Sequence, residues 1–348
     1  MKPRAYLGQP NKAQWKELYN AAITFQEATP WEWMANEDIF AVVNPIDAQT
    51  GYCSILGNGG EEFGLGIFLG DAGLRRLVAL IEEQEDDEAS AAIMTPGLVF
   101  LLANRRELDD EDRKIIHSLD LSFRGKNAWP LFRSQRPGYA PWFLERDEVI
   151  YLTATLRQAL EIAGKVKAGS LDLRQNLMRG KIITCYSTEN GWRERWHTLG
   201  LRSLADVSKG EPLGAADEAT LFLLSKRIKE RSGSWEFDIF VTPARIGLTG
   251  SRPYHPLCFM AVDREYGLVV QMNMTQPWLN VSQKRKEVIH LLEKSETLPE
   301  EIRVRSQSTK ALLEPIAHAL GMRLRVSRLR LLEDAKASLY EYLSRGKK

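Results

Sequence analysis

The stretch from Trp15 to Leu77 constrains the fold most strongly, because a helical apolar pattern passes there directly into strands that carry spaced glycines. Apolar side chains recur every three or four residues over positions 12–27, which predicts an amphipathic helix with Asn11 as its N-cap. Pro30 is expected to end this helix. The block therefore predicts how the fold begins and names no reaction.

Three short strands are predicted after this helix, at residues 39–43, 52–56 and 63–69. A loop with the sequence Gly-Asn-Gly-Gly-Glu joins the second strand to the third, so these two strands form a predicted hairpin. Gly64 and Gly66 alternate within the third strand and leave one of its faces without side chains. Such spacing is typical of a place where a ring or another backbone approaches closely.

The rest of the chain alternates between helices and strands. Helices are predicted at residues 71–81, 108–119, 141–167, 217–229, 283–295, 309–320 and 331–343. Strands are predicted at residues 94–104, 177–186, 191–198, 235–242, 257–262, 268–274, 302–304 and 323–326. Residues 127–142 are expected to be irregular. The strand at 235–242 alternates, so it is expected to be half-buried, with Glu236 and Asp238 opposite its apolar face.

Two domains are expected, because 348 residues exceed what a single core usually organises. Pro, Gly, Ser and Arg cluster between Pro243 and Pro256, which favours a boundary there. Residues 1–242 would form an aromatic-rich α+β domain, itself divisible near residues 125–145. Residues 243–348 would form a smaller α+β domain. Each is predicted to have a mixed or antiparallel sheet, and the second to carry its helices on one face.

Two predicted hairpins resemble each other, since Phe63-Gly64-Leu65 and Tyr266-Gly267-Leu268 both place Gly-Leu after an aromatic residue. An internal duplication and a chance likeness of apolar hairpins both explain this echo. Near the C-terminus, Arg323, Arg325, Arg328 and Arg330 make a locally basic segment. A contact with RNA or an acidic partner, and an exposed edge kept soluble by charge, are the two interpretations of that segment.

Bulk properties narrow the class of protein. The net charge of +1 argues against general nucleic-acid binding, although it leaves room for a local patch. No apolar run is long enough to span a membrane, and the N-terminal residues lack an apolar segment of secretory length. The three cysteines, Cys53, Cys185 and Cys258, are far apart and fit neither a disulfide framework nor a metal site. A cytoplasmic location is therefore expected.

No motif with a known mechanism occurs, so no catalytic residue, cofactor site or metal site is predicted. The glycine-rich loop at 57–61 lacks the Lys-Ser/Thr of a phosphate-binding loop. The five histidines show no zinc spacing. His255 lies between prolines at the predicted domain junction, and it is kept as a candidate although a structural role is the favoured interpretation.

Aromatic side chains supply most of the candidate binding residues. In a strand, Trp192 and Trp196 share one face while Arg193 and Arg195 occupy the other. Such a surface can stack on a base, a peptide or a sugar, and a core face opposite a solvated face explains the same pattern. The candidate binding residues are Trp31, Trp33, Tyr52, Glu61, Trp192, Trp196 and His255.

Two sets of short sequence blocks lie at the two ends of the chain. The N-terminal blocks are Trp15-x-x-Leu18-Tyr19, Pro30-Trp31-x-Trp33, Gly51-Tyr52, Gly60-Glu61 and Gly64-Leu65. The C-terminal blocks are Pro299-Glu300-x-Ile302-x-Val304, Leu313-x-Pro315, Leu320-Gly321 and Leu331-Leu332-Glu333-x-Ala335. These blocks resemble an uncharacterised family of bacterial proteins, and the resemblance implies a two-domain protein. It brings no assigned activity, so no functional residue is carried over.

The leading hypothesis is a cytoplasmic, non-catalytic binding protein that recognises a protein or a small ligand. The rival is a hydrolase or nuclease-like enzyme whose carboxylates assemble from distant strands, which predicts that two or more members of one set converge in a concave pocket. That set is Asp38, Glu61, Glu62, Asp71, Asp263 and His255. A structural subunit would instead show a large apolar interface between copies of the chain.

Overall fold

The computed structural model describes residues 8–81, 88–199, 213–248 and 250–345. Compactness divides the chain into two units. The first consists of residues 1–136 and 141–204, and the second of residues 137–140 and 205–348. The division thus falls near residue 204, whereas the sequence patterns favoured a boundary after Thr242.

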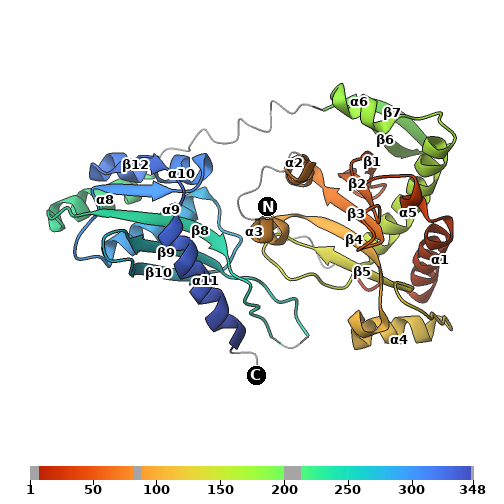
Figure 1. The fold of residues 1–348 in the computed structure, drawn as a ribbon, viewed down its shortest axis with the longest axis horizontal. Coiled ribbons are helices and arrows are strands. Elements are labelled where there is room, and N and C mark those ends of the chain that lie inside the picture. Colours follow the sequence, from red (N-terminus) through yellow and green to blue (C-terminus); the bar gives the residue numbers. More distant parts are fainter. Residues whose placement is uncertain (1–7, 82–87, 200–212, 249, 346–348) are drawn as a thin grey trace. The chain divides into compact units, whose positions relative to one another are not determined.

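The first unit is built on a seven-stranded sheet in the order β5-β4-β3-β2-β1-β6-β7 (Figure 1). Only β1 and β6 run parallel, and the other neighbours are antiparallel. The strands are β1 Phe40–Val43, β2 Thr50–Leu56, β3 Gly64–Leu69, β4 Gly97–Ala103, β5 Trp129–Gln135, β6 Lys181–Thr188 and β7 Gly191–Thr198. The predicted hairpin is confirmed as β2 and β3, whose residues pair from Gly51–Leu69 to Leu56–Gly64.

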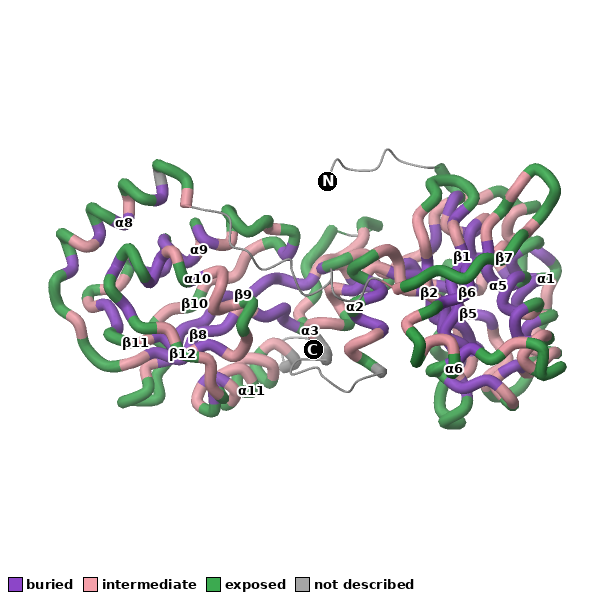
Figure 2. Tube along the Cα trace, turned by 90° about the horizontal axis from the view of Figure 1, so that it is seen from above, coloured by how far each residue is buried: buried purple, intermediate pink, exposed green. Residues whose placement is uncertain are grey.

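Helices cover both faces of this sheet. They are α1 Lys12–Ala28, η1 Pro30–Glu32, α2 Gly70–Ile81, α3 Glu88–Met94, η2 Arg105–Glu107, α4 Asp110–Ser118, α5 Arg146–Lys167 and α6 Leu173–Met178. The main core joins α1 and α5 to one face, and Leu77 of α2 belongs to a smaller cluster with Ile39, Ala41 and Ile182 on the other. Figure 2 shows the buried positions running along the strands between these helices.

The start of α1 follows from its sequence. Asn11 accepts a hydrogen bond from the Gln14 amide at 2.9 Å, and the Gln14 side chain accepts one from the Asn11 amide at 2.9 Å. This reciprocal pair satisfies two amides that the first helical turn leaves without partners. Thr29 is left-handed, with φ of 47°, and ends the helix one residue before Pro30.

The second unit has a five-stranded sheet in the order β10-β9-β8-β11-β12. β8, β9 and β10 are antiparallel neighbours, while β11 and β12 run parallel to β8. The strands are β8 Ser234–Val241, β9 Leu257–Asp263, β10 Val269–Thr275, β11 Glu301–Val304 and β12 Arg323–Val326. The helices are α8 Ala215–Arg227, α9 Val281–Glu293, α10 Gln307–Leu320 and α11 Arg330–Arg345. The α+β class is confirmed in both units.

Helices cover both faces of this second sheet, which corrects the prediction of a single covered face. Met274 of β10 packs with the cluster that contains Leu332 of α11. The next residue back, Asn273, donates to Glu287 of α9 at 2.7 Å. Because adjacent residues of a strand point to opposite faces, α9 and α11 lie on opposite sides of the sheet.

Three local predictions are also corrected. Residues 129–135 form β5 inside the stretch that was expected to be irregular, and α5 begins at Arg146 instead of Pro141. β8 is not half-buried, since Glu236 and Asp238 are buried as well as the apolar residues around them. β8 pairs with β9 and β11 in the second sheet.

Candidate functional site

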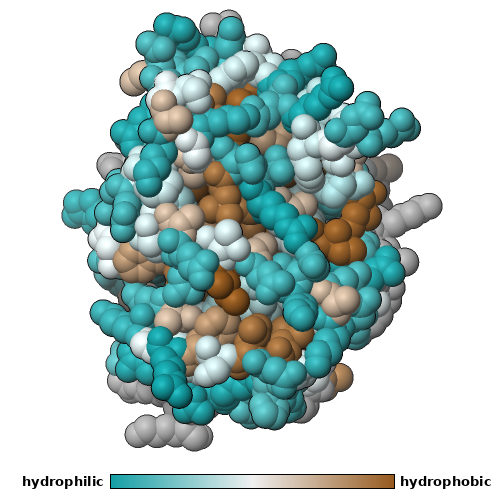
Figure 3. Space-filling model, turned by 90° about the vertical axis from the view of Figure 1, so that its right-hand side faces the viewer, coloured by the Kyte–Doolittle hydropathy of each residue, from teal (hydrophilic) through white to brown (hydrophobic). Residues whose placement is uncertain are grey.

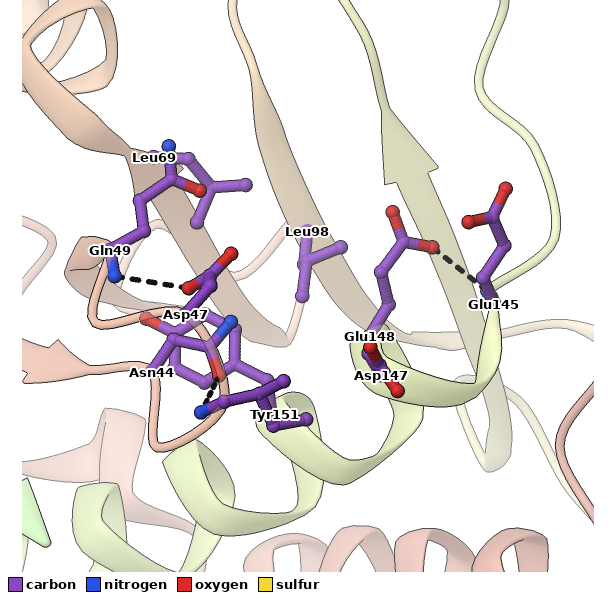
Figure 4. Close-up of a pocket in the computed structure, with 10 residues that line it drawn as sticks. Asn44, Asp47, Gln49, Leu69, Leu98, Glu145, Asp147, Glu148 and Tyr151 are labelled. Carbon is purple, nitrogen blue, oxygen red and sulfur yellow. Dashed lines mark hydrogen bonds between the residues drawn. The ribbon is translucent and has the colours of Figure 1, made fainter. Parts of the chain in front are cut away.

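A pocket of about 170 Å³ opens in the first unit between the β1–β2 turn and the first turn of α5 (Figure 4). Its lining residues are Asn44, Ile46, Asp47, Gln49, Leu69, Leu98, Glu145, Asp147, Glu148 and Tyr151. Four of them are acidic. Its volume equals that of roughly five water molecules, so it has room for the end of a small ligand.

The β1–β2 turn presents its polar side chains in a braced conformation. Asn44 Oδ1 accepts from the Ile46 amide at 3.0 Å, and Asp47 Oδ1 accepts from the Gln49 amide at 3.0 Å. The Asn44 amide donates to the Gln49 carbonyl at 2.9 Å and closes the turn. Short polar side chains that bond their own backbone are what such a turn requires. One wall of the pocket is therefore preformed.

The opposite wall is the acidic first turn of α5. Glu148 accepts from the Glu145 amide at 2.8 Å and from the Ser134 hydroxyl at 2.8 Å. Asp147 is buried and pairs with Arg146 Nε at 3.1 Å. Arg136 pairs with Glu145 at 2.5 Å. All three carboxylates thus stand at the N-terminal end of α5, where the helix dipole is positive.

Tyr151 and two leucines make the apolar part of the lining. The Tyr151 hydroxyl donates to the Val42 carbonyl at 2.7 Å, and burial raises the pKa of this phenol well above its ordinary value. The ring fits against β2 only because Gly51 has no side chain, since a Cβ there would overlap the Tyr151 hydroxyl. Leu69 and Leu98 come from β3 and β4. Carboxylates beside an apolar surface suit a cationic group on an aliphatic stem.

A second group of charges lies on the α11 side of the second sheet. Arg305, which follows β11, places Nε 3.4 Å from Asp238 Oδ2 and Nη1 3.1 Å from Glu333 Oε1. Burial raises the pKa of Asp238, while Arg305 and Lys336 act in the opposite direction. Carboxylates from β8 and α11 thus do come together, with a guanidinium between them.

Glu236 lies on the same face of β8 and serves the fold. Its Oε2 accepts from the Leu332 amide at 2.9 Å, in the first turn of α11. Its Oε1 lies 3.4 Å from Arg264 Nε. A carboxylate at the start of a helix is favoured by the free amides there. Within the described residues, no three His, Cys, Asp or Glu side chains gather in a way that could hold a metal ion.

The aromatic candidates of the N-terminal block pack against the core. Trp31 packs on Phe25 and Phe63, at ring separations of 6.1 and 5.2 Å. Trp33 Nε1 donates to the Ala163 carbonyl at 3.0 Å. Tyr52 is half-buried. Its pKa is raised, mainly by burial and to a smaller extent by the negative charge of Asp71. These side chains are held by neighbours of the first unit.

Trp192 and Trp196 lie on β7, an edge strand of the first sheet. Trp192 packs against the main core, whereas Trp196 is 38% exposed. His255 is buried in the second unit, where Nδ1 lies 3.1 Å from the Thr242 carbonyl oxygen. A carbonyl oxygen only accepts, so Nδ1 carries the proton and the ring braces the chain.

The described contacts do not bring members of the proposed catalytic set into one pocket. Asp38 accepts from the Ala35 amide at 2.8 Å and from Arg174 Nε at 2.9 Å. Asp263 accepts two amides of its own turn, at 2.8 and 3.0 Å. Glu61 and Glu62 are exposed in the β2–β3 loop. Each acid therefore has a local setting of its own.

Sequence patterns missed the two sites that the structure does show. Asp147 and Glu148 were placed inside a long helix that was expected to start five residues earlier. The start at Arg146 makes them first-turn residues, and the run Glu-Arg-Asp-Glu is the signal that marks such a turn. Asp238 was placed on a solvent face because it alternates with apolar residues.

The surface of the first unit is mixed in character. Figure 3 shows apolar areas broken up by polar side chains on the face that it presents. A shallower groove of about 300 Å³ runs between α1 and α5. It is lined by Ala13, Gln14, Glu17, Ile150, Thr153, Ala154 and Arg157.

In the described parts of the chain, no helix is both long and apolar enough to cross a membrane.

Two family models match the chain. Residues 15–184 match a domain of unknown function, DUF7309, and residues 221–340 match a second one, DUF6930. The second range includes all five strands of the second sheet, β8 among them. These matches agree with the resemblance to an uncharacterised family.

Likeness to solved structures is weak. The catalytic core domain of the HTLV-2 integrase in complex with magnesium gives a TM-score of 0.25 at 13% identity, over 34% of this chain and 75% of that chain. A simian T-cell lymphotropic virus intasome in complex with the PP2A regulatory subunit B56 gamma gives 0.24 at 16% identity, over 33% and 42%. Such scores carry no argument about function. No curated protein matches the chain.

Proposed function

We propose that this chain, which matches two domains of unknown function, is a non-catalytic binding protein. Its first unit would hold the cationic end of a ligand. The ammonium or guanidinium group would lie among the carboxylates of the pocket, with its aliphatic stem against Leu69, Leu98 and the Tyr151 ring. A cytoplasmic location is part of this proposal. It is supported by the three cysteines, which are buried and form no disulfide.

One observation carries the proposal. Glu145, Asp147 and Glu148 place three carboxylates around one pocket, and two arginines, Arg136 and Arg146, pair with them in the described contacts. Hydrogen bonds from the Glu145 amide and the Ser134 hydroxyl hold the Glu148 carboxylate before any ligand arrives, and the ion pairs with Arg136 and Arg146 hold the other two. A preorganised group of acids loses little side-chain entropy on binding, which favours a cation.

The arrangement of Asp238, Arg305 and Glu333 supports the non-catalytic half of the proposal over the nuclease-like rival. Carboxylates that serve a hydrolase act as a base, an acid or metal ligands, and each of these roles needs lone pairs that face the substrate or the metal. The Arg305 guanidinium lies against both carboxylates instead. These carboxylate oxygens therefore face a side chain of the protein itself.

Saturation-transfer NMR on the intact chain tests the pocket, because that method detects weak binding of small probes. The probes are n-butylammonium, n-butylguanidinium and the neutral n-butanol. Both cations are expected to give signals that fade as salt is added, since the attraction is electrostatic. n-Butanol is expected to give little, because it offers no charge to the carboxylates.

Asp147→Asn removes one charge from the pocket at nearly constant shape. The affinity for the cations is expected to fall about tenfold or more, which is the effect of losing one charge-assisted contact. Glu111→Gln is the matched control. Glu111 lies in the acidic first turn of α4, as Asp147 does in α5, but outside the pocket. Equal binding of n-butanol, or an equal loss in both variants, would overturn the proposal.

A further inference from the structure

β10 forms one edge of the second sheet and has a neighbouring strand on one side only (Figure 1). It pairs antiparallel with β9, from Val269 opposite Val262 to Thr275 opposite Leu257. On its other side, no strand of the described residues takes up its backbone groups. A free strand edge is a template for pairing with another chain.

The other three edges of the two described sheets carry features that discourage such pairing. β5 contains Pro130, and Trp142 bridges to Ser134 on its outer side through hydrogen bonds of 2.8 and 3.0 Å. β7 is charged along its length, with two arginines and a glutamate in its centre. β12 is only four residues long and carries Arg323 and Arg325. Proline, charge and shortness are the usual protections of an edge.

β10 has none of these protections. Its seven residues, Val-Val-Gln-Met-Asn-Met-Thr, include no charge and no proline. Apolar side chains along it are exposed, with Val269 at 46%, Val270 at 37% and Met272 at 47%, and Leu268 just before the strand is 65% exposed. The register with β9 shifts between Val269 and Gln271, and Gln271 to Thr275 pair regularly with β9. A stripe of this kind marks an interaction surface.

We propose that β10 pairs with β10 of a second copy of this chain, antiparallel and about a two-fold axis. The absence of charge on β10 favours this occupant. A neutral strand can lie antiparallel to its own copy in any register without bringing like charges together, whereas β7 or β12 would place arginine near arginine. Isologous two-fold contacts are the commonest form of self-association. The two five-stranded sheets become one continuous sheet.

The proposal concerns the second unit and stands independently of the cation pocket in the first. Full overlap of the two strands sets Met272, the central residue of β10, opposite its own copy. Cβ atoms of residues that face each other across antiparallel strands lie about 5 Å apart. A charge at position 272 is therefore the sharpest available probe.

Sedimentation equilibrium of the intact chain at several protein concentrations is the test. The wild-type chain is expected to reach twice its monomer mass. Met272→Lys sets two ammonium groups opposite each other, and the dissociation constant of the dimer is expected to rise about tenfold or more. Met178→Lys is the matched control. Met178 is 89% exposed on α6 of the first unit, so the same substitution there should leave the dimer unchanged.

A charge swap separates the proposed contact from damage to the fold. Met272→Glu is also expected to be monomeric, and an equal mixture of the Lys and Glu variants is expected to recover the dimer, because a Lys then faces a Glu. Hydrogen exchange of the wild-type chain adds a measurement without any variant. The β10 amides should become more protected as the protein concentration rises.

Each contrary result overturns the proposal. A wild-type chain that stays monomeric at every concentration leaves the edge to a different occupant. A Met272→Lys chain that dimerises like the wild type shows that another surface makes the dimer. The proposal is also wrong if the mixture of the two charged variants stays monomeric. It is wrong as well if the dimer forms and the β10 amides gain no protection.

Discussion

The guanidinium of Arg305 lies 3.4 Å from the carboxylate of Asp238, on the face of the second sheet that α11 covers. Asp238 is in the central strand, and its side chain is 8% exposed. The pair is therefore largely removed from water, where a charge without a partner is costly. Glu333 of α11 shares the same guanidinium. Helix and sheet are joined here by charge as well as by apolar packing.

Arg305→Met is expected to lower the free energy of unfolding by about 3 kcal/mol, because Asp238 keeps its burial and loses its counter-ion. Urea unfolding of the intact chain measures the change. Arg323→Met is the control, since Arg323 is exposed and its pairing with Glu300 at 3.6 Å should contribute less than about 0.5 kcal/mol. A double variant that also carries Asp238→Asn should recover part of the loss. Equal losses in the two single variants would refute this account.

Asp238 is expected to make stability depend on pH. Burial raises its folded pKa above the ordinary value of 3.8, so between 3.8 and the folded pKa the folded chain holds more protons than the unfolded chain. The contribution of Asp238 to stability is therefore complete below 3.8 and is lost as the pH rises through the folded pKa. Asp238→Asn has no such titration. The variant should gain stability relative to the wild type as the pH rises from 3.8 through the folded pKa of Asp238. A difference that stays flat across that range in urea unfolding would contradict the burial of this carboxylate.

Gly51→Ala is expected to lower the free energy of unfolding by about 2 kcal/mol, because the new methyl group overlaps the Tyr151 hydroxyl and Ile67. The clash also disturbs the hydrogen bond from Tyr151 to Val42. Gly59→Ala is the matched control, since no atom lies within 4 Å of a Cβ there. Thermal unfolding of both variants should show a clear fall for the first and almost none for the second. Similar melting temperatures would mean that the ring is free to move aside.

All three cysteines are expected to resist thiol reagents in the folded chain. Burial raises the pKa of the Cys185 and Cys258 thiols to about 12, and raises the pKa of Cys53 well above its ordinary value. The thiolate is the reactive form, so a rise from 9 to about 12 lowers its fraction roughly a thousandfold. Reaction with a disulfide reagent at pH 8 should be slow in buffer and fast in urea. One thiol that reacts promptly in buffer would show that its strand opens.

Much of the fold could be predicted from local pattern. The helix after Asn11, the hairpin around the glycine-rich loop and the helix that Gly321 ends are all where the periodicity placed them. Each depends on neighbours in sequence, such as a cap, a turn residue or a repeat of three and four. Gly57 also behaves as expected of a loop glycine, with a φ of 138° and no space for a side chain beside Trp31.

The misses have a common cause. Residues 129–135 contain a proline and a run of mixed polarity, so nothing local marks them as a strand, and β4 and Trp142 make them one by pairing on either side. Glu236 and Asp238 alternate with apolar residues as solvent-facing residues do. They are covered by α11, which lies nearly a hundred residues later in the chain. The Leu332 amide of α11 donates to Glu236, and Glu333 shares Arg305 with Asp238.

The chain by itself thus determined its class, its local elements and the absence of a known catalytic motif, because caps, turns and apolar repeats act between residues close in sequence. Tertiary structure alone decided which acids gather. The β1–β2 turn meets α5 around the pocket, and Asp238 meets Arg305 and Glu333 beneath α11, through contacts that span from tens of residues to about a hundred. Burial and electrostatic pairing depend on distance in space, which no spacing in sequence records.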